Sequence, residues 1–180
     1  MRLIHTSDWH LGHRFHGRRR HDEQGRFLDW LAGLIETQAI DALLAAGDVF
    51  DTAAPGSRAQ SLYYRFLHRL AGSACRHVVV IGGNHDSPAL LEAPRELLRQ
   101  LDIHVVGMAG DQPDKEILLL RDRQGTPELV VCAVPFLRDR DIRLAAAGET
   151  LEEKGRQLRE GVRDHYQQVC AEADRLRREI

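Results

Sequence analysis

The chain has 180 residues, of which 43% are hydrophobic and 29% charged, and its net charge is −2. These values are typical of a globular domain with a real core, and the charge argues against a protein that holds nucleic acid by bulk attraction. The apolar runs are only strand-length, so no membrane span is expected. Three widely spaced cysteines and an N-terminus without a leader pattern favour reduced thiols and a cytoplasmic location.

The first part of the chain alternates between strand-like and helix-like stretches. Strands are expected over 2–6, 41–46, 77–81 and 103–106, and helices over 22–38, 58–71 and 88–101. Residues 12–21 are expected to form a loop, and Ser57 to cap the helix that follows it. Repeated strand–loop–helix units predict a layered α/β fold with parallel strands. Polar residues that follow the strands then meet at one edge of the sheet.

The last part of the chain has a different pattern. Two strands, 116–120 and 128–133, are expected to form a hairpin that turns at Gln124-Gly125. One long helix is expected from about Thr150. A helix that covers a sheet is favoured over a coiled coil, because the apolar repeat is short and contains Gly155 and Gly161. Residues 1–180 are expected to be the N-terminal part of a single domain.

Three polar clusters follow expected strands and carry the residue types of a metal site. They contain Asp8 and His10, then Asp48 after Gly47, then Asn84 and His85 after Gly83. In an extended segment, side chains two residues apart point the same way, so Asp8 and His10 can reach one ion. Oxygen and nitrogen donors without a thiolate favour Mn²⁺, with Fe²⁺ or Zn²⁺ as alternatives. Asp48 is the natural bridge between two ions.

Each cluster alone has an ordinary explanation. A strand-end Asp-x-His is more often a cap or a surface pair, Gly-Asp is common in turns, and Asn-His-Asp is compatible with an Asx-turn. The three together, each at a strand end, instead predict a two-metal phosphoesterase site.

The order DxH…GD…GNHD resembles the signature of the calcineurin-like metallophosphoesterases. The stretches HTSDWHLG, AGDVFDTAAP, GNHDS and VPFLRDRDI are similar to the nuclease subunits of bacterial SbcCD complexes. The resemblance implies that Asp8, His10 and Asp48 bind a first ion, that Asp48 and Asn84 bind a second, and that His85 is catalytic. Relatives in archaea and eukaryotes carry a histidine where this chain has Asp51, so Asp51 is assigned no catalytic role.

The resemblance also implies a substrate and partners. The activity would be ATP-dependent double-strand exonuclease and single-strand endonuclease cleavage of DNA, in recombination, replication and repair. The partner would be an SbcC-like ATPase subunit, with helices 58–71 and 88–101 forming a homodimer within a heterotetramer. Arg18, Arg19 and Arg20 are candidates for DNA phosphate contacts, and a solvated basic loop explains them equally well.

The family pattern needs three further histidines, in GH and GHxH motifs. After His85 the chain has only His104 and His165, and neither follows a glycine. The fold is therefore expected to be incomplete at its C-terminal side, and the chain to be an inactive fragment by itself. Two alternatives stay open. One is a phosphoesterase for small esters, and the other is a non-catalytic piece that dimerises or binds a partner.

Overall fold

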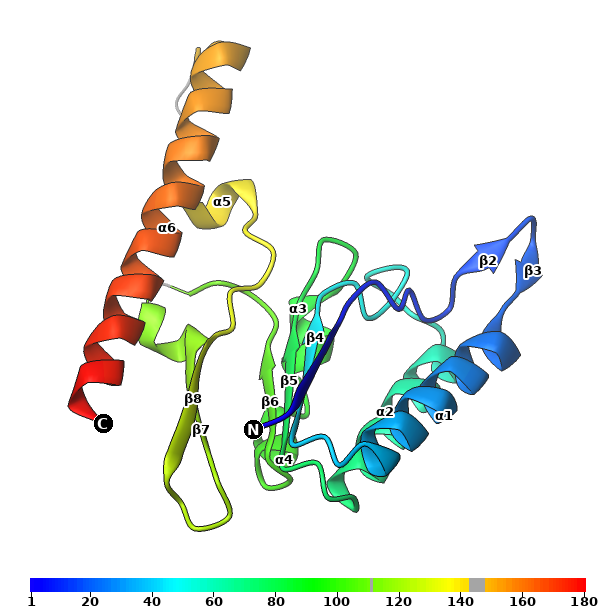
Figure 1. Ribbon diagram of the computed structural model, residues 1–180. Coiled ribbons are helices and arrows are strands. Elements are labelled where there is room, and N and C mark those ends of the chain that lie inside the picture. Colours follow the sequence, from blue (N-terminus) through cyan, green and yellow to red (C-terminus); the bar gives the residue numbers. More distant parts are fainter. Residues whose placement is uncertain (111, 143–147) are drawn as a thin grey trace. The chain divides into compact units, whose positions relative to one another are not determined.

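The computed structural model describes residues 1–110, 112–142 and 148–180, which form two compact units, Met1–Gly107 and Met108–Ile180 (Figure 1). The first unit contains a four-stranded sheet in the order β1-β4-β5-β6. Its strands are β1 (Leu3–Thr6), β4 (Ala42–Ala46), β5 (His77–Ile81) and β6 (Ile103–Val106). All neighbouring strands pair in parallel, which confirms the expected α/β architecture. Their carboxyl ends therefore meet at one edge.

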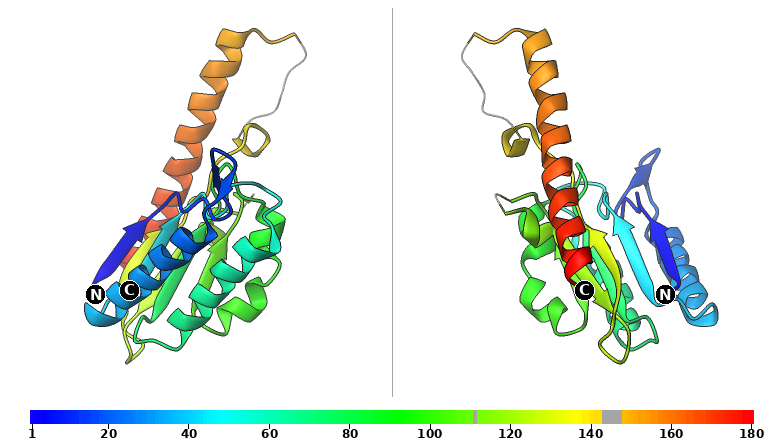
Figure 2. Two further views of the ribbon diagram at one scale, coloured as in Figure 1. Left: turned by 90° about the vertical axis from the view of Figure 1, so that its right-hand side faces the viewer. Right: turned by 60° about the vertical axis from the view of Figure 1, so that its left-hand side comes forward.

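Two long helices cover one face of this sheet. α1 (His21–Thr37) and α2 (Ser57–Ala71) lie side by side (Figure 2). Their apolar faces and one face of the sheet form a buried core that includes Leu31, Ile35, Leu67, Leu43 and Val80. Each fully buried leucine or isoleucine stabilises the fold by about 1.5–3 kcal/mol. The packed core therefore holds in place the strands from which the loops of the site begin.

Three local expectations for this unit are wrong. The helix expected over 88–101 is two short helices, α3 (Pro88–Glu92) and α4 (Arg95–Arg99), because Pro94 has no N–H to donate within a continuous helix. Gly56 occupies the N-cap position of α2, so Ser57 is already helical. The expected loop contains a small hairpin, β2 (Arg14–Phe15) and β3 (Arg18–Arg19), which turns through His16 and Gly17 at positive φ.

The second unit joins a hairpin to a long helix, as expected. A short 3₁₀ helix, η1 (Pro113–Glu116), precedes the antiparallel strands β7 (Ile117–Arg121) and β8 (Pro127–Cys132). After α5 (Asp139–Ile142), α6 (Leu151–Glu179) begins with a capping box between Thr150 and Glu153. α6 packs against η1, β7 and β8, and buries Val169 and Ala173. Neither α6 nor any other helix among the described residues is apolar and long enough to cross a membrane.

Candidate metal centre

Three loops converge at the carboxyl edge of the parallel sheet. The Asp8 amide donates to the Gly47 carbonyl at 3.1 Å, and the His10 amide donates to the Asp48 carbonyl at 3.0 Å. The His85 amide donates to Oδ1 of Asp48 at 3.0 Å. The loop after β4 is thus bonded to the loops after β1 and β5, and Asp48 lies between the other two clusters.

The backbone at the candidate ligands is not extended. Asp8, His10 and Asp48 have φ values of 57°, 43° and 50°, all in the left-handed region. That conformation costs a non-glycine residue about 1–2 kcal/mol, and such strain gathers at functional sites. Asp8 and His10 do converge, but the expectation that they do so through an extended segment is wrong.

The side chains of these three residues form a compact donor group. Nε2 of His10 lies 3.6 Å from Oδ1 of Asp8 and 3.8 Å from Oδ2 of Asp48. One donor atom from each residue lies within 4.8 Å of the other two. Donors that share an ion at bonds of about 2.0–2.2 Å are separated by distances of this order. The residues therefore fit a divalent ion, and the set of two carboxylates and one imidazole suits Mn²⁺, Fe²⁺ or Zn²⁺.

A second donor group overlaps the first and includes a residue to which the sequence pattern assigns no role. His10, Asp51 and His85 also place donor atoms within 4.8 Å of one another. Oδ1 of Asp51 lies 3.5 Å from Nδ1 of His10 and 2.9 Å from Nδ1 of His13. Asp51 and His13 therefore belong to the local geometry. Their only sequence signal is closeness to Asp48 and His10, which does not separate them from ordinary loop residues.

His85 is oriented by a backbone carbonyl. Its Nδ1 donates to the carbonyl of Asp51 at 2.7 Å, and its ring meets the His10 ring edge-on with centroids 4.9 Å apart. That hydrogen bond raises the pKa of His85, and the negative charges of Asp48, Asp51 and Asp86 add to the rise. The imidazole is exposed, and Nε2 is the nitrogen that this bond leaves for another partner.

A buried carboxylate locks two of the loops together. Asp86 is only 2% exposed, and it accepts hydrogen bonds from the amides of Val49, Phe50 and Gly83 at 2.9–3.1 Å. Because Val49 and Phe50 directly follow Asp48, Asp86 fixes where the Asp48 carboxylate lies relative to His85. Asp86 is a positioning residue that the sequence shows only as part of GNHD.

Two glycines make this close approach possible, for different reasons. Gly47 has a φ of 88°, a conformation that glycine adopts readily and that lets the chain turn before Asp48. Gly83 is needed instead for space, since a Cβ there would lie 2.1 Å from Oδ1 of Asp48. Gly83 is therefore required for the space that it leaves to the Asp48 carboxylate.

The remaining candidates fall into two groups. Asn84 is exposed and lies between Gly83 and His85, both of which contact Asp48. Neither downstream histidine has a comparable place in this donor group. His104 clusters with His77 and Asp102, and His165 pairs with Glu116 at 2.8 Å.

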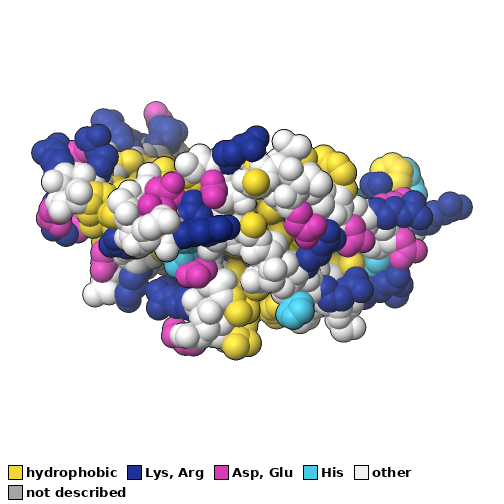
Figure 3. Space-filling view, turned by 60° about the horizontal axis from the view of Figure 1, so that its bottom comes forward, with side chains coloured by type: hydrophobic (Ala, Val, Ile, Leu, Met, Phe, Trp, Pro, Cys, Tyr) yellow, Lys and Arg dark blue, Asp and Glu magenta, His cyan; other side chains and the backbone are white. Residues whose placement is uncertain are grey.

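The basic residues after the first cluster project from the small hairpin. Arg18, Arg19 and Arg20 are exposed, and basic side chains project at the end of Figure 3 that corresponds to the hairpin in Figure 1. Arg20 is also close to the candidate centre, because it lines a hollow of about 380 Å³ together with Asp8. Its guanidinium pairs with Glu23 at 2.6 Å.

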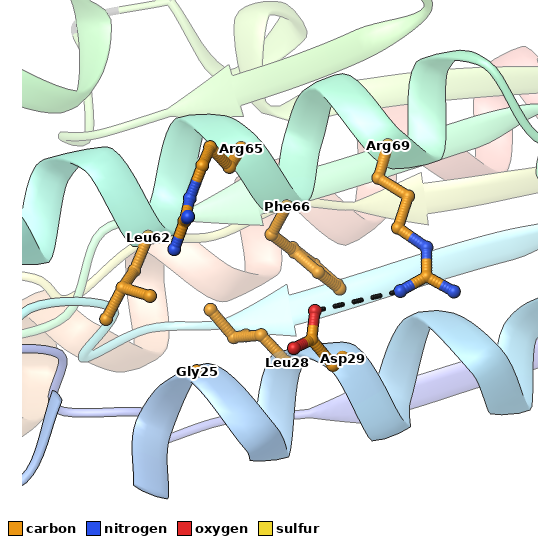
Figure 4. A pocket seen from close by; sticks show the side chains of 7 residues that line it. All are labelled: Gly25, Leu28, Asp29, Leu62, Arg65, Phe66 and Arg69. Atoms are coloured by element: carbon orange, nitrogen blue, oxygen red, sulfur yellow. Dashed lines mark ion pairs between the residues drawn. The ribbon is translucent and has the colours of Figure 1, made fainter. Parts of the chain in front are cut away.

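A groove between α1 and α2 has no candidate ligand in its lining. Leu28, Leu62 and Phe66 form its floor, and Arg69 and Asp29 face each other across it at 3.7 Å (Figure 4). Both charged side chains are largely exposed, so the pair contributes little to stability. The groove is therefore a seam between packed helices.

Comparisons with known proteins identify the family of the chain. Residues 1–131 match the family described as Calcineurin-like phosphoesterase, and the chain therefore belongs to that family of phosphate-ester hydrolases. Within it, the chain is similar to proteins that are named as a subunit of the nuclease SbcCD. It is 46% identical over 177 residues to the one from Escherichia coli (strain K12), covering 98% of this chain and 43% of that protein. It is 40% identical over 148 residues to the one from Rhodobacter capsulatus, covering 79% of this chain and 36% of that protein. The chain thus spans less than half the length of these relatives.

Proposed function

We propose that the chain contributes the first half of a two-metal phosphodiesterase site that cleaves DNA. The observation that carries the proposal is the donor group of Asp8, His10 and Asp48, with the His85 ring beside it. Similarity to proteins named as nuclease subunits supports a nucleic-acid substrate. In this proposal Asp48 bridges two ions, Asn84 is a ligand of the second, and Mn²⁺ is the metal.

The roles of the side chains follow from their surroundings. When bound, the ions would neutralise charge on the attacked phosphate. His85, held by the Asp51 carbonyl, would donate from Nε2 to a phosphate or leaving-group oxygen. Asp86 and Gly83 would keep Asp48 in place.

Mn²⁺ titration of the 180-residue chain tests the metal half of the proposal. Free Mn²⁺ is measured by electron paramagnetic resonance. Asp48→Asn is expected to weaken binding at least about tenfold, since even outer-shell changes cost that much. Gly83→Ala should have a similar effect, because its methyl group would overlap the Asp48 carboxylate. Asp29→Asn, at an exposed site on α1, is the matched control. Unchanged binding in Asp48→Asn would overturn the assignment.

Substrate assays separate the proposal from its alternatives. These 180 residues are proposed to bind metal without cutting linear duplex DNA, because they lack the GH and GHxH histidines. Restoring those motifs by fusing the downstream segment of a relative should then produce Mn²⁺-dependent DNA cleavage that His85→Ala abolishes. Turnover of p-nitrophenyl phosphate but not of DNA would support a small-ester phosphoesterase instead. Metal binding without turnover of either substrate by the fusion would support a non-catalytic role.

Arg18, Arg19 and Arg20 are proposed to contact DNA phosphates. The triple alanine variant should weaken DNA binding by the chain. The slope of the logarithm of the binding constant against the logarithm of salt concentration should fall by the equivalent of up to about three phosphate contacts. Replacing Arg175, Arg177 and Arg178 on α6 is the matched control, because these three are paired with acidic neighbours. An unchanged salt slope in the Arg18–Arg20 variant would reject the contact.

We also propose that the protein binds an SbcC-like ATPase subunit and forms a homodimer. The structure bears on the surface of the homodimer. The apolar face of α2 is already buried, including Leu62, Phe66 and Leu70, so α2 offers little apolar surface. Leu97 and Leu101 are 67% and 43% exposed at and just after α4, and they are the better candidates for a dimer contact. Sedimentation of the chain at micromolar concentration should show a dimer that Leu97→Glu dissociates. A monomeric parent chain would argue against a dimer through this region.

A further inference from the structure

A second group of metal-ligating side chains lies at the opposite end of the parallel sheet. His77 is the first residue of β5, Asp102 directly precedes β6, and His104 lies within β6. One donor atom from each lies within 4.8 Å of the other two. β5 has five residues and runs from this group toward the loop of His85, which separates the two groups by more than roughly 13 Å.

Strand register explains why these three side chains meet. Val78 pairs with Ile103 and Val79 with His104, so His77 is opposite Asp102. Because side chains alternate along a strand, His77, Val79 and His104 point to the same face. Asp102 directly precedes β6 with a φ of 55°, and its carboxylate reaches the two imidazoles from there. The two imidazole rings lie with centroids 6.5 Å apart and planes inclined by 36°. A shift of one residue in the pairing would separate the donors.

The chemistry of the group suits a borderline transition metal. Burial is the main cause that lowers the pKa of His104, which favours the neutral imidazole that a metal ion binds. His77 and His104 are half-buried and Asp102 is exposed, which leaves an approach for an ion from solvent. Arg99 adds a positive charge near His104. Glu96 partly offsets that charge, since its Oε1 lies 3.9 Å from Nη1 of Arg99. A donor set of two imidazoles and one carboxylate selects Zn²⁺, Co²⁺ or Ni²⁺ over Mg²⁺ and Ca²⁺.

We propose that His77, Asp102 and His104 form a separate binding site for a transition-metal ion of the Zn²⁺ class. Three protein ligands leave at least one coordination position open to water. The ion would bridge β5 and the edge strand β6, and so fasten the outer strand to the sheet. The site does not depend on the proposed phosphodiesterase function, since it shares no residue with the candidate metal centre.

Counting bound ions tests the site directly. The parent chain, His77→Gln, His104→Gln and the control His68→Gln are dialysed against Zn²⁺, and bound zinc is measured per chain. His68 is exposed on α2 and outside the group. Relative to the parent, each of the two site variants should lose one bound ion, or bind it at least about tenfold more weakly. His68→Gln should match the parent. Asp48→Asn should leave this ion bound.

Imidazole nuclear magnetic resonance of the parent chain keeps the proposal testable if a variant does not fold. Zn²⁺ should shift the ring signals of His77 and His104 together, at the same metal concentration, in both the parent and Asp48→Asn. Mg²⁺ at the same concentration should not. Equal zinc content in the parent and both site variants, or ring signals that do not respond to Zn²⁺, would overturn the site.

Discussion

Two buried carboxylates, one in each unit, are held in opposite ways. Asp86, 2% exposed, accepts from three backbone amides. Glu116, 1% exposed, accepts from the His165 ring at 2.8 Å and from the Gly110 amide at 3.4 Å. Backbone amides cannot change charge, whereas an imidazole can. The first arrangement fixes loop geometry at a candidate site, and the second ties α6 to η1.

The largest expected effect comes from removing the first carboxylate. Asp86→Ala should lower the free energy of unfolding of the first unit by about 3–5 kcal/mol, because it leaves three buried amides without their acceptor. Urea unfolding followed by tryptophan fluorescence measures this unit, since both tryptophans, Trp9 and Trp30, belong to it. Asp29→Ala at an exposed position should change stability by less than about 0.5 kcal/mol. A loss below about 1 kcal/mol in Asp86→Ala would show that the amides find other partners.

The second carboxylate should respond differently to loss of its partner. His165→Ala should cost the second unit about 2–4 kcal/mol, because Glu116 stays buried with one long hydrogen bond. Hydrogen exchange of the α6 backbone amides in increasing urea measures the stability of this unit. The double variant Glu116→Leu/His165→Leu should recover most of the loss, since apolar packing can replace a buried hydrogen-bonded pair. Additive losses in the double variant would contradict this account of the pair.

Short apolar runs predict the strands of the parallel sheet well. The candidate site depends on where these strands end. The strands expected over 77–81 and 103–106 are present in the structure. The expected family is confirmed by the match of residues 1–131. The grouping of Asp8, His10 and Asp48 follows from parallel pairing, which brings the carboxyl ends to one edge. The break of the helix at Pro94 is also visible as a proline, but the leucine pattern on either side of it favours one continuous helix.

Other features of the site could not be predicted, because they depend on close approaches across the fold. Asp86 resembles any Asp in a turn until the amides of Val49 and Phe50 are brought to it. Gly83 resembles a turn glycine, although its role is to leave room for Asp48. Asp51 and His13 are close to Asp48 and His10 along the chain, but only the folded structure brings their side chains together. Each of these requires distances that no spacing along the chain encodes.

A smaller effect is expected from His104, a partly buried histidine in the first unit. Burial lowers its pKa below the usual value near 6.5. At pH values between this lowered pKa and 6.5, His104 binds a proton in the unfolded chain but not in the folded chain. The free energy of unfolding therefore falls as the pH drops through 6.5. With EDTA present, His104→Gln should show a flatter dependence of tryptophan-monitored unfolding between pH 7.5 and 5.5. If the free energy of unfolding depends on pH equally in variant and parent, groups other than His104 cause the acid sensitivity.

The smallest expected effect concerns a hydroxyl near Asp86. Tyr63 is fully buried against Phe50, and its hydroxyl has no hydrogen-bond partner among the described residues. Burial, with the charge of Asp86 as a lesser cause, raises its pKa far above the usual value, so the phenol stays neutral. Tyr63→Phe should therefore leave the stability of the first unit unchanged or raise it by up to about 1 kcal/mol. A clear loss would reveal a water-mediated hydrogen bond between the Tyr63 hydroxyl and Asp86.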